Sequence, residues 1–418
     1  MCDHTGSISE MWRYVQRSLF PYLESVVESP LTERHQLLVG VIETVRPERF
    51  LTGELLWRPV GAPRIDRKRI VVAFLAKAVM EVPTTKALRE RLLVDRVLRG
   101  LCGWEGRRDV PSESTFSRAF GMFAETRLLD RVHEAIAKRH LSGEIVWHIS
   151  RDATAIEGRE RPTPQAGTSA GETPQAGTSA GEAPQAGTSA GETPQAGTSA
   201  GETPQAGTSA GEADPAPPKR GRGRPKKGEV VPPPPTTRIK KQRTQTTEDA
   251  IRELPTSCDK GTKKDAKGNA HSWIGYKLHV DVTEDGLPTS ALTTSASLHD
   301  SQVAIPLHRL TRTRVGTIFY ELMDAAYDAK GIWDEIGEAD QTAIIDRNKR
   351  NGPTPPPMEP DRARHYNGRS AVERFNSDLK DNHGGRTVRV RGHSKVHCHL
   401  MFGVVALFAD HALKLLSG

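Results

Sequence analysis

An acidic residue flanked by cations marks one short segment of the chain, YNGRSAVERFNSDLK, from Tyr366 to Lys380. On a helix of about 3.6 residues per turn, four polar residues share one narrow face: Tyr366, Arg369, Glu373 and Lys380. The apolar residues lie on the opposite face, which such a helix would bury. This pattern suits the binding of a phosphate-bearing substrate, although a solvated amphipathic helix has the same pattern. The choice between the two interpretations depends on other parts of the chain.

Two further acidic residues follow segments with the alternation of β-strands. The sequence EIVWHISRD predicts a strand that ends on Asp152, and VGTIFYELMD predicts one that ends on Asp324. A hairpin and a helix from about Ser301 are predicted between them. A short helix, a strand and the helix with Glu373 are predicted after them. An RNase H-like sheet requires this order of elements. Its first and fourth strands are parallel neighbours, so Asp152, Asp324 and Glu373 should meet at one place.

Three carboxylates at one place repel each other unless cations neutralise them. We therefore expect two Mg²⁺ ions about 3.5 to 4 Å apart, with Mn²⁺ as a substitute. One ion would activate water or a 3′-hydroxyl, and the other would stabilise the leaving oxygen. Arg369 and Lys380 would grip the phosphates beside the scissile bond, and Tyr366 would stack on or hydrogen-bond to the same strand. A glycosidase also uses two carboxylates, but it needs no flanking cations.

These motifs resemble those of a known family. The spacing Tyr366-x2-Arg369-x3-Glu373-x6-Lys380 is similar to the Tyr-Arg-Glu-Lys signature of bacterial insertion-sequence transposases of the DDE class. The stretches SRDATAIEGRE and MDAAYDAKG resemble that family's first and second acidic motifs, and GNAHSWIGYKLHVDV with TSASLHDSQ resembles its hairpin region. LCGW and VPSESTFSRAF resemble its N-terminal helical domain. The resemblance covers nearly everything outside residues 160 to 250.

The resemblance implies a fold, a set of site residues and a reaction. The fold is an RNase H-like catalytic domain, and the catalytic and metal-binding residues are the triad Asp152, Asp324 and Glu373. The reaction is DNA hydrolysis at the ends of the element, followed by strand transfer into target DNA. The partner is double-stranded DNA, and because two ends must be brought together, we expect a homodimer on DNA. Two alternatives stay open: a decayed copy that only binds DNA, and a related nuclease that cuts without joining.

A long segment of low complexity interrupts the chain. Residues 163 to 212 are five near-copies of TPQAGTSAGE, without an aromatic residue or Leu, Ile, Val or Met. Such a segment cannot bury enough apolar surface to fold, so we expect a disordered tether. Residues 219 to 243 hold ten Lys or Arg and one Glu, and such a basic block attracts a polyanion. Arg222 and Arg224 within it match the core of a minor-groove AT-hook, with non-specific phosphate binding as the alternative.

The predicted fold class is mixed α and β: an N-terminal helical bundle, then an RNase H-like mixed sheet with a disordered insertion. The helical, DNA-binding domain should span residues 10–140. The catalytic domain should begin with a strand at 144–159 and resume at 251–418, with the tether and basic block occupying 160–250. Within residues 10–140, apolar residues recur every three to four positions, as in helices.

One predicted helix of the bundle is a candidate for DNA contact. Pro111 and Ser112 indicate a helix start after the helical stretch 87–101, which gives a helix, a turn and a helix. Three polar residues near the start of the second helix are the candidate contacts: Ser114, Ser117 and Arg118. Most helical bundles share this arrangement, so the pattern alone does not decide the function.

Three other acidic residues lie near the triad in the sequence. Asp328 follows Asp324 by four residues and could bind metal in its place, although the strand-end position favours Asp324. Glu157 lies beyond the end of the predicted strand and should face solvent. Asp300 precedes a helix, where the role of an N-cap fits better than catalysis.

The remaining sequence patterns concern a candidate zinc site, the oxidation state of the cysteines and the cellular compartment. A zinc site in the cluster His393, His397, Cys398 and His399 would need a second ligand pair, which the sequence lacks, so structural or DNA-facing histidines are predicted. The four cysteines form no CxxC pair, as expected of reduced thiols. The start of the chain lacks a signal-peptide pattern, and the apolar run 400–409 is shorter than a membrane span. We expect a cytoplasmic, nucleoid-associated bacterial protein without a membrane partner.

Overall fold

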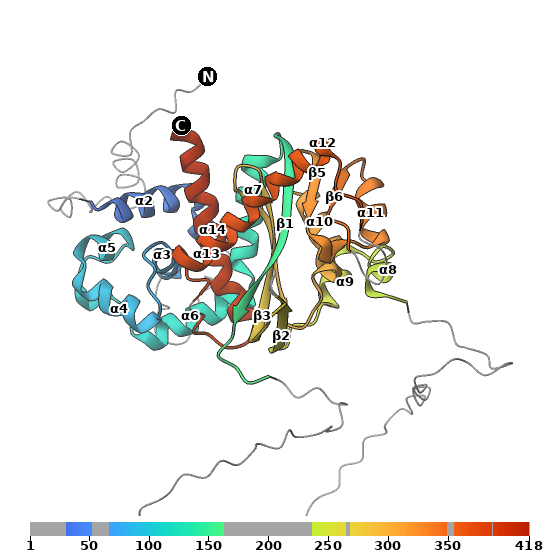
Figure 1. Ribbon diagram of the computed structural model, residues 1–418. Helices are drawn as coiled ribbons and strands as arrows, with labels where there is room; N and C mark the ends of the chain where they lie inside the picture. Colours follow the sequence, from blue (N-terminus) through green and yellow to red (C-terminus); the bar gives the residue numbers. More distant parts are fainter. Residues whose placement is uncertain are drawn as a thin grey trace, which may run out of the picture. The chain divides into compact units, whose positions relative to one another are not determined.

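The computed structural model describes residues 31–51, 67–162, 236–264, 268–348, 355–386 and 388–417. The predicted repeat tether and the two AT-hook arginines, Arg222 and Arg224, lie outside these residues. Within them the structure confirms the predicted fold class, because a set of N-terminal helices precedes a mixed parallel and antiparallel sheet that carries further helices (Figure 1).

The N-terminal helices begin at polar caps. Thr32 accepts a hydrogen bond from the His35 backbone amide at the start of its helix, and Asp95 accepts one from Leu98. Because Asp95 ends one helix and caps the next, the helical stretch predicted at 87–101 is two helices. The helices of this part are α2 (Glu33–Val45), α3 (Arg67–Val79), α4 (Thr85–Val94), α5 (Arg96–Leu101), α6 (Glu113–Glu125) and α7 (Leu128–Leu141).

A six-stranded sheet follows, with strands in the order β2-β3-β1-β5-β6 and with β4 paired to β3. The pairs β1–β3, β2–β3 and β3–β4 are antiparallel, and β1–β5 and β5–β6 are parallel. The first predicted strand and the fourth are therefore parallel neighbours, as expected. The strands are β1 (Ile145–Glu157), β2 (Asp259–Lys264), β3 (Ala270–Thr283), β4 (Pro288–Ser295), β5 (Thr317–Met323) and β6 (Thr342–Ile345).

β1 is longer than its sequence pattern predicts. The alternating pattern ends at Asp152, whereas β1 continues to Glu157, inside the predicted range 144–159, because it stays paired with β3 up to Gly275. Pairing with β5 stops earlier, at Ser150 opposite Leu322. Asp152 therefore lies inside β1, two residues past the point where its parallel neighbour ends the ladder.

Several elements were not predicted, including the edge strand β2, two short helices before it, and the helices Pro360–Tyr366 and His393–Ser417. The edge strand β2 has the sequence DKGTKK, which lacks apolar alternation and is rich in Lys, a common feature of exposed edges. α8 (Arg238–Gln242) lies inside the range 160–250 that was expected to be disordered, and α9 (Thr247–Arg252) begins inside it. Both have threonine N-caps, and each buries one residue, so the end of the predicted disordered range is helical.

Helices cover both faces of the sheet. α10 packs against β3 and β4, whereas α13 packs against β1 and β3. Successive residues of a strand point to opposite faces. Arg151 contacts the α10 side through Asp281 and Thr311, and Asp152 contacts α13, so these helices lie on opposite faces. The remaining helices are α10 (Ala304–Arg312), α11 (Lys330–Gly337), α12 (Pro360–Tyr366), α13 (Ser370–Asn382) and α14 (His393–Ser417).

The N-terminal helices and the sheet share one hydrophobic core. α14 contacts α2, α3, α6 and α7 as well as β4, and lies between the two parts in Figure 1. The predicted helical domain 10–140 therefore has no separate core among the described residues: one continuous cluster runs from Leu38 through β1 and β3 to Ala412. By length and composition His393–Leu416 could cross a membrane, but 72% of its apolar window is buried in the protein, as in a core helix.

Candidate active site

Three carboxylates from distant parts of the chain meet around one guanidinium group. Arg369 Nη2 lies 3.5 Å from Asp152 Oδ1 and 4.0 Å from Asp324 Oδ2. Arg369 Nη1 lies 2.5 Å from Glu373 Oε1. The structure thus brings together the three acids that the sequence singles out.

The sheet explains how Asp152 and Asp324 become neighbours. Ser150 on β1 pairs with Leu322 on β5 in parallel register, and each acid lies two residues beyond that pair. Asp324 is the first residue after β5, and its Oδ1 accepts a hydrogen bond from the Ala326 backbone amide, 3.0 Å away. This bond fixes the orientation of the carboxyl group and leaves Oδ2 toward Arg369.

The segment Tyr366–Lys380 is not the single regular helix that the helical wheel assumes. α12 ends at Tyr366, a 3₁₀ turn spans Asn367–Arg369, and α13 starts at Ser370. The tighter turn changes the angle between Tyr366 and the residues of α13. The predicted buried face is present in α13, where four apolar residues are buried: Ala371, Val372, Phe375 and Leu379.

Burial and charge act in opposite directions at this cluster. Burial raises the pKa of Asp152, although Arg369 lowers it in part. Burial alone would lower the pKa of Arg369, but Asp152 and the other neighbouring acids outweigh it and raise that pKa. The arginine therefore stays charged and neutralises part of the acidic charge.

Asn376, which the sequence did not single out, lies against Asp152. It lies one turn after Glu373 on α13 and is buried, and its Nδ2 donates a hydrogen bond to Asp152 Oδ2 at 3.2 Å. Its Oδ1 is buried without a hydrogen-bond partner among the described residues. The three carboxylates and the amide of Asn376 carry oxygen atoms, the ligand type that a divalent ion such as Mg²⁺ prefers, and in this structure the Arg369 guanidinium lies between the carboxylates. The sequence does mark Asn376 in one way, because it is a polar residue on the otherwise apolar face of α13.

A basic rim adjoins Asp152. Lys380 lies on α13, and burial together with the nearby charges of Arg386 and Lys263 lowers its pKa. Lys263 belongs to the edge strand β2, is exposed, and lowers the pKa of Asp152. Tyr366 is partly buried at the end of α12, and burial raises the pKa of its hydroxyl. These groups offer positive charge and one aromatic ring beside the three acids.

Behind Asp152, the opposite face of the sheet holds a buried ionic network. Arg151 donates from Nε and Nη2 to the two oxygens of Asp281, both at 2.7 Å, and its Nη1 lies 3.1 Å from Glu321 Oε2. His308 on α10 lies 2.5 Å from Glu321 Oε1, and Thr311 donates to Asp281. All three charged side chains of the strands are at most 1% exposed. The network fixes β1 at the residue that precedes Asp152.

The other acidic candidates have structural surroundings. Asp328 accepts hydrogen bonds from the Trp333 indole and the Asn348 backbone, at 3.1 Å each, so its carboxylate holds a loop. Glu157 is exposed as predicted, but it is the last residue of β1. The N-cap prediction for Asp300 is wrong: the cap position is His299, and Asp300 instead accepts a bond from Lys277 Nζ at 2.8 Å.

The histidine cluster of α14 has structural partners, as predicted. His393 and His399 each bond to a backbone carbonyl, those of Thr293 and Gly384. His397 bridges Thr293 Oγ1 and Asp130 Oδ1, at 2.8 and 2.9 Å. These nitrogens are used within the fold, so the cluster does not converge on a metal.

The predicted DNA-contacting helix is present as α6, but a long connection precedes it. Residues 102–112 separate α5 from α6, whereas a helix-turn-helix motif has a turn of about three to four residues. The three candidate contacts on α6 are exposed: Ser114, Ser117 and Arg118. The support for DNA contact is therefore this exposed polar face rather than a helix-turn-helix geometry.

Comparison with family models decides the family. A model described as the transposase DDE domain matches residues 236–409, and a second, described as a transposase domain, matches residues 32–121. Together they match the sheet domain after the insertion and most of the N-terminal helices. The chain belongs to the DDE transposases. No curated protein and no solved structure matches it.

The matched ranges of this transposase omit β1, because the insertion separates that strand from residues 236–409. Asp152 is therefore outside the match, and its place in the site comes from the geometry: β1 pairs with β3 and β5 of the matched domain. DDE transposase domains act on DNA and generally use divalent metal ions.

Proposed function

We propose that this transposase cuts DNA at the ends of its own mobile element and joins the freed ends to target DNA. One observation carries the proposal: Asp152, Asp324 and Glu373 converge on Arg369 although the chain separates them widely. These three residues, with Asn376 beside them, would hold two Mg²⁺ ions, for which Mn²⁺ would substitute. When bound, the ions activate the attacking water or 3′-hydroxyl and stabilise the leaving oxygen.

The chain's own groups have distinct tasks in this proposal. Asn376 orients the Asp152 carboxylate through its hydrogen bond. Arg369 balances the acidic charge until DNA and metal arrive, and then turns to a phosphate oxygen, to which a guanidinium can donate two hydrogen bonds. Lys380 and Lys263 attract the DNA backbone beside the scissile bond, and Tyr366 offers a ring for stacking or a hydroxyl for a hydrogen bond.

The DNA is held more widely than at the acids alone. The exposed polar face of α6 would contribute phosphate contacts. The basic block with Arg222 and Arg224 would add non-specific affinity that falls as salt rises. Because two ends of an element must be processed together, the working form would be a homodimer on DNA in the bacterial nucleoid.

The test uses the full chain, a DNA fragment with the inverted ends that flank the gene, and Mg²⁺. We expect 3′-hydroxyl nicks and joined products. Asp152→Asn, Asp324→Asn and Glu373→Gln should each abolish both products while DNA binding in a mobility-shift assay stays within a factor of two. The matched control is Glu157→Gln, an exposed acid on the same strand as Asp152, which should keep full activity.

The other outcomes separate the rivals. Nicks without joining would indicate a nuclease, and salt-sensitive binding without any cleavage would indicate a protein that only binds DNA. Equal activity in Asp152→Asn or Glu373→Gln would remove the triad from the proposal.

A further inference from the structure

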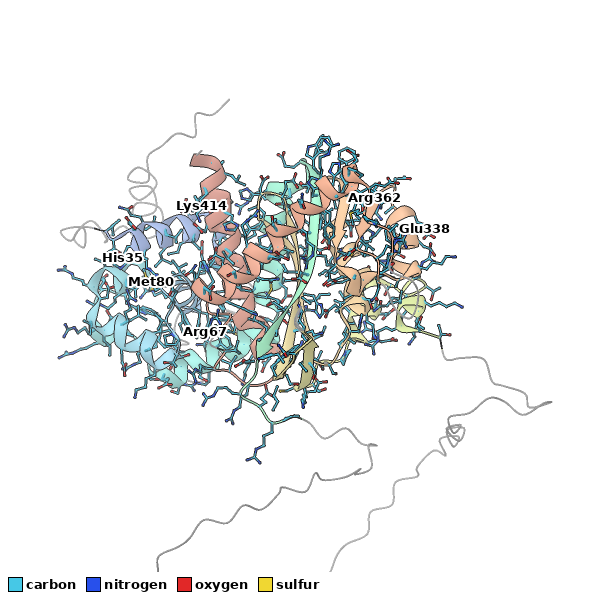
Figure 2. All side chains as sticks on the ribbon, in the orientation of Figure 1. His35, Arg67, Met80, Glu338, Arg362 and Lys414 are labelled. Atoms are coloured by element: carbon cyan, nitrogen blue, oxygen red, sulfur yellow. The ribbon has the colours of Figure 1, made fainter. Side chains whose placement is uncertain are left out.

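A second group of metal-binding side chains lies on the far side of α13 from the three acids. Asp378 of α13 and two residues of α14, Asp410 and His411, place one ligand atom each within 4.8 Å of one another. None of them takes part in the proposed cleavage site. The group borders an open groove whose lining includes Asp378, Asp410 and Lys414, and Lys414 is labelled in Figure 2.

His411 is oriented as a metal ligand requires. Its Nδ1 donates to the Gly286 carbonyl at 2.8 Å, which leaves Nε2 to face Asp378 Oδ2 at 3.7 Å. Histidines that bind metals usually donate their other ring nitrogen to a carbonyl or carboxylate in this way. Gly286 has φ +84°, and a Cβ there would lie 2.8 Å from His411 Nδ1, so the turn between β3 and β4 fits closely around the imidazole.

A further histidine adds a fourth candidate ligand beside Asp378. His383 follows α13 and is 94% buried, and its Nδ1 has no hydrogen-bond partner among the described residues. That nitrogen lies 3.6 Å from Asp378 Oδ1. Burying an unpartnered polar atom is costly, so the atom calls for a ligand.

The distances favour a shared ligand over direct hydrogen bonds. A separation of 3.6 or 3.7 Å is too long for a hydrogen bond. Ligand atoms around a tetrahedral Zn²⁺ with bonds of about 2.0 to 2.1 Å lie roughly 3.3 Å apart. The known bonds of the two acids use one oxygen each, Asp378 Oδ1 with Asn382 and Asp410 Oδ2 with Lys414. The second oxygen of each acid therefore remains available for an ion.

We propose that Asp378, Asp410 and His411, with His383 beside them, bind a structural Zn²⁺ ion. Mixed imidazole and carboxylate ligands suit zinc better than magnesium. The ion would tie α13, which carries Glu373, to α14, which packs against the N-terminal helices. The groove supplies the path by which zinc enters.

The test measures Zn²⁺ binding rather than cleavage, so that it does not depend on the proposed function. The full chain with Asp152→Asn and Asp324→Asn is stripped with a chelator, and Zn²⁺ is titrated in competition with a chromogenic chelator. We expect one ion per chain, and at least a 10-fold loss of affinity in His411→Gln and in Asp378→Asn. Gly286→Ala should also weaken binding, by about 10-fold, because it displaces the group that orients His411.

Asp381→Asn is the matched control, since Asp381 lies on the same helix and groove but pairs with Arg386. It should bind Zn²⁺ as the parent does. Co²⁺ should give the visible absorption of a four-coordinate site, absent in His411→Gln. Circular dichroism checks that each variant folds, and His383→Gln replaces any variant that does not. A parent protein that binds no Zn²⁺, or a loss in Asp381→Asn equal to that in His411→Gln, would overturn the proposal.

Discussion

Arg369 Nη2 lies 3.5 Å from Asp152 Oδ1, so a cation of the protein itself occupies the space between the acids. Divalent ions must compete with this guanidinium for the same carboxylates. We predict that Arg369→Ala binds Mn²⁺ more tightly than the parent protein but cleaves DNA about 100-fold more slowly, because a phosphate-stabilising donor is lost. Calorimetric titration measures Mn²⁺ affinity, and a cleavage assay measures the rate. In both, Arg369→Lys should lie between the parent protein and Arg369→Ala. Weaker Mn²⁺ binding in Arg369→Ala would contradict this role.

Asn376 should matter for cleavage although it does not carry charge. Its hydrogen bond orients Asp152, and such outer partners of metal ligands contribute roughly 10- to 100-fold in affinity or activity. We predict a loss of that size for Asn376→Ala in single-turnover cleavage. Ser377→Ala is the control, because Ser377 is exposed on the same helix and bonds only to Asp381 among described residues. Equal rates for the two variants would show that Asp152 needs no orienting partner.

The buried network behind the site should dominate the stability of the sheet. Glu321→Ala would leave Arg151 and His308 without a shared partner in the core, and removing one member of a buried ion pair costs about 3 to 5 kcal/mol. Urea denaturation measures this change. The exposed pair of Glu134 and Lys138 is the comparison, for which Glu134→Ala should cost less than about 1 kcal/mol. A small effect of Glu321→Ala would mean that water reaches the network.

Buried histidines predict a loss of stability in mild acid. Burial lowers the pKa of His279 and of His399 to about 4 from an ordinary value of 6.5. The unfolded chain therefore binds protons that the folded chain does not, so stability is full above pH 6.5 and falls as the pH drops toward 4. Each histidine contributes a slope of about 1.4 kcal/mol per pH unit. Denaturation midpoints between pH 7 and 4.5 should fall less steeply in His279→Gln, whereas exposed His271→Gln should follow the parent protein.

The sequence predicts the catalytic sheet well because its strands carry strong local patterns. β3, β4, β5 and β6 fall where alternation and turns place them, and the order of elements is enough to predict that Asp152 and Asp324 are neighbours. β2 escapes prediction because its stability comes from pairing with β3, not from apolar residues of its own. The extension of β1 past Asp152 has the same cause, since a neighbouring strand rather than the local pattern decides where it ends.

Much of the site cannot be predicted from the sequence, because it depends on contacts between segments that are far apart in the chain. Glu373 is recognisable from its spacing, but the bond from Asn376 to Asp152 and the position of the Lys263 charge near the site depend on how α13 and β2 pack. The Arg151–Asp281 pair likewise depends on the register of β1 and β3, which the spacing of residues within one strand does not reveal.

The most direct measurement is a crystal structure of the protein with Mn²⁺, analysed by anomalous scattering. We predict two Mn²⁺ peaks bound by Asp152, Asp324 and Glu373, with Arg369 moved away from these carboxylates. Saturating Mn²⁺ that leaves this position without a peak, or that binds only elsewhere, would contradict the proposed active site.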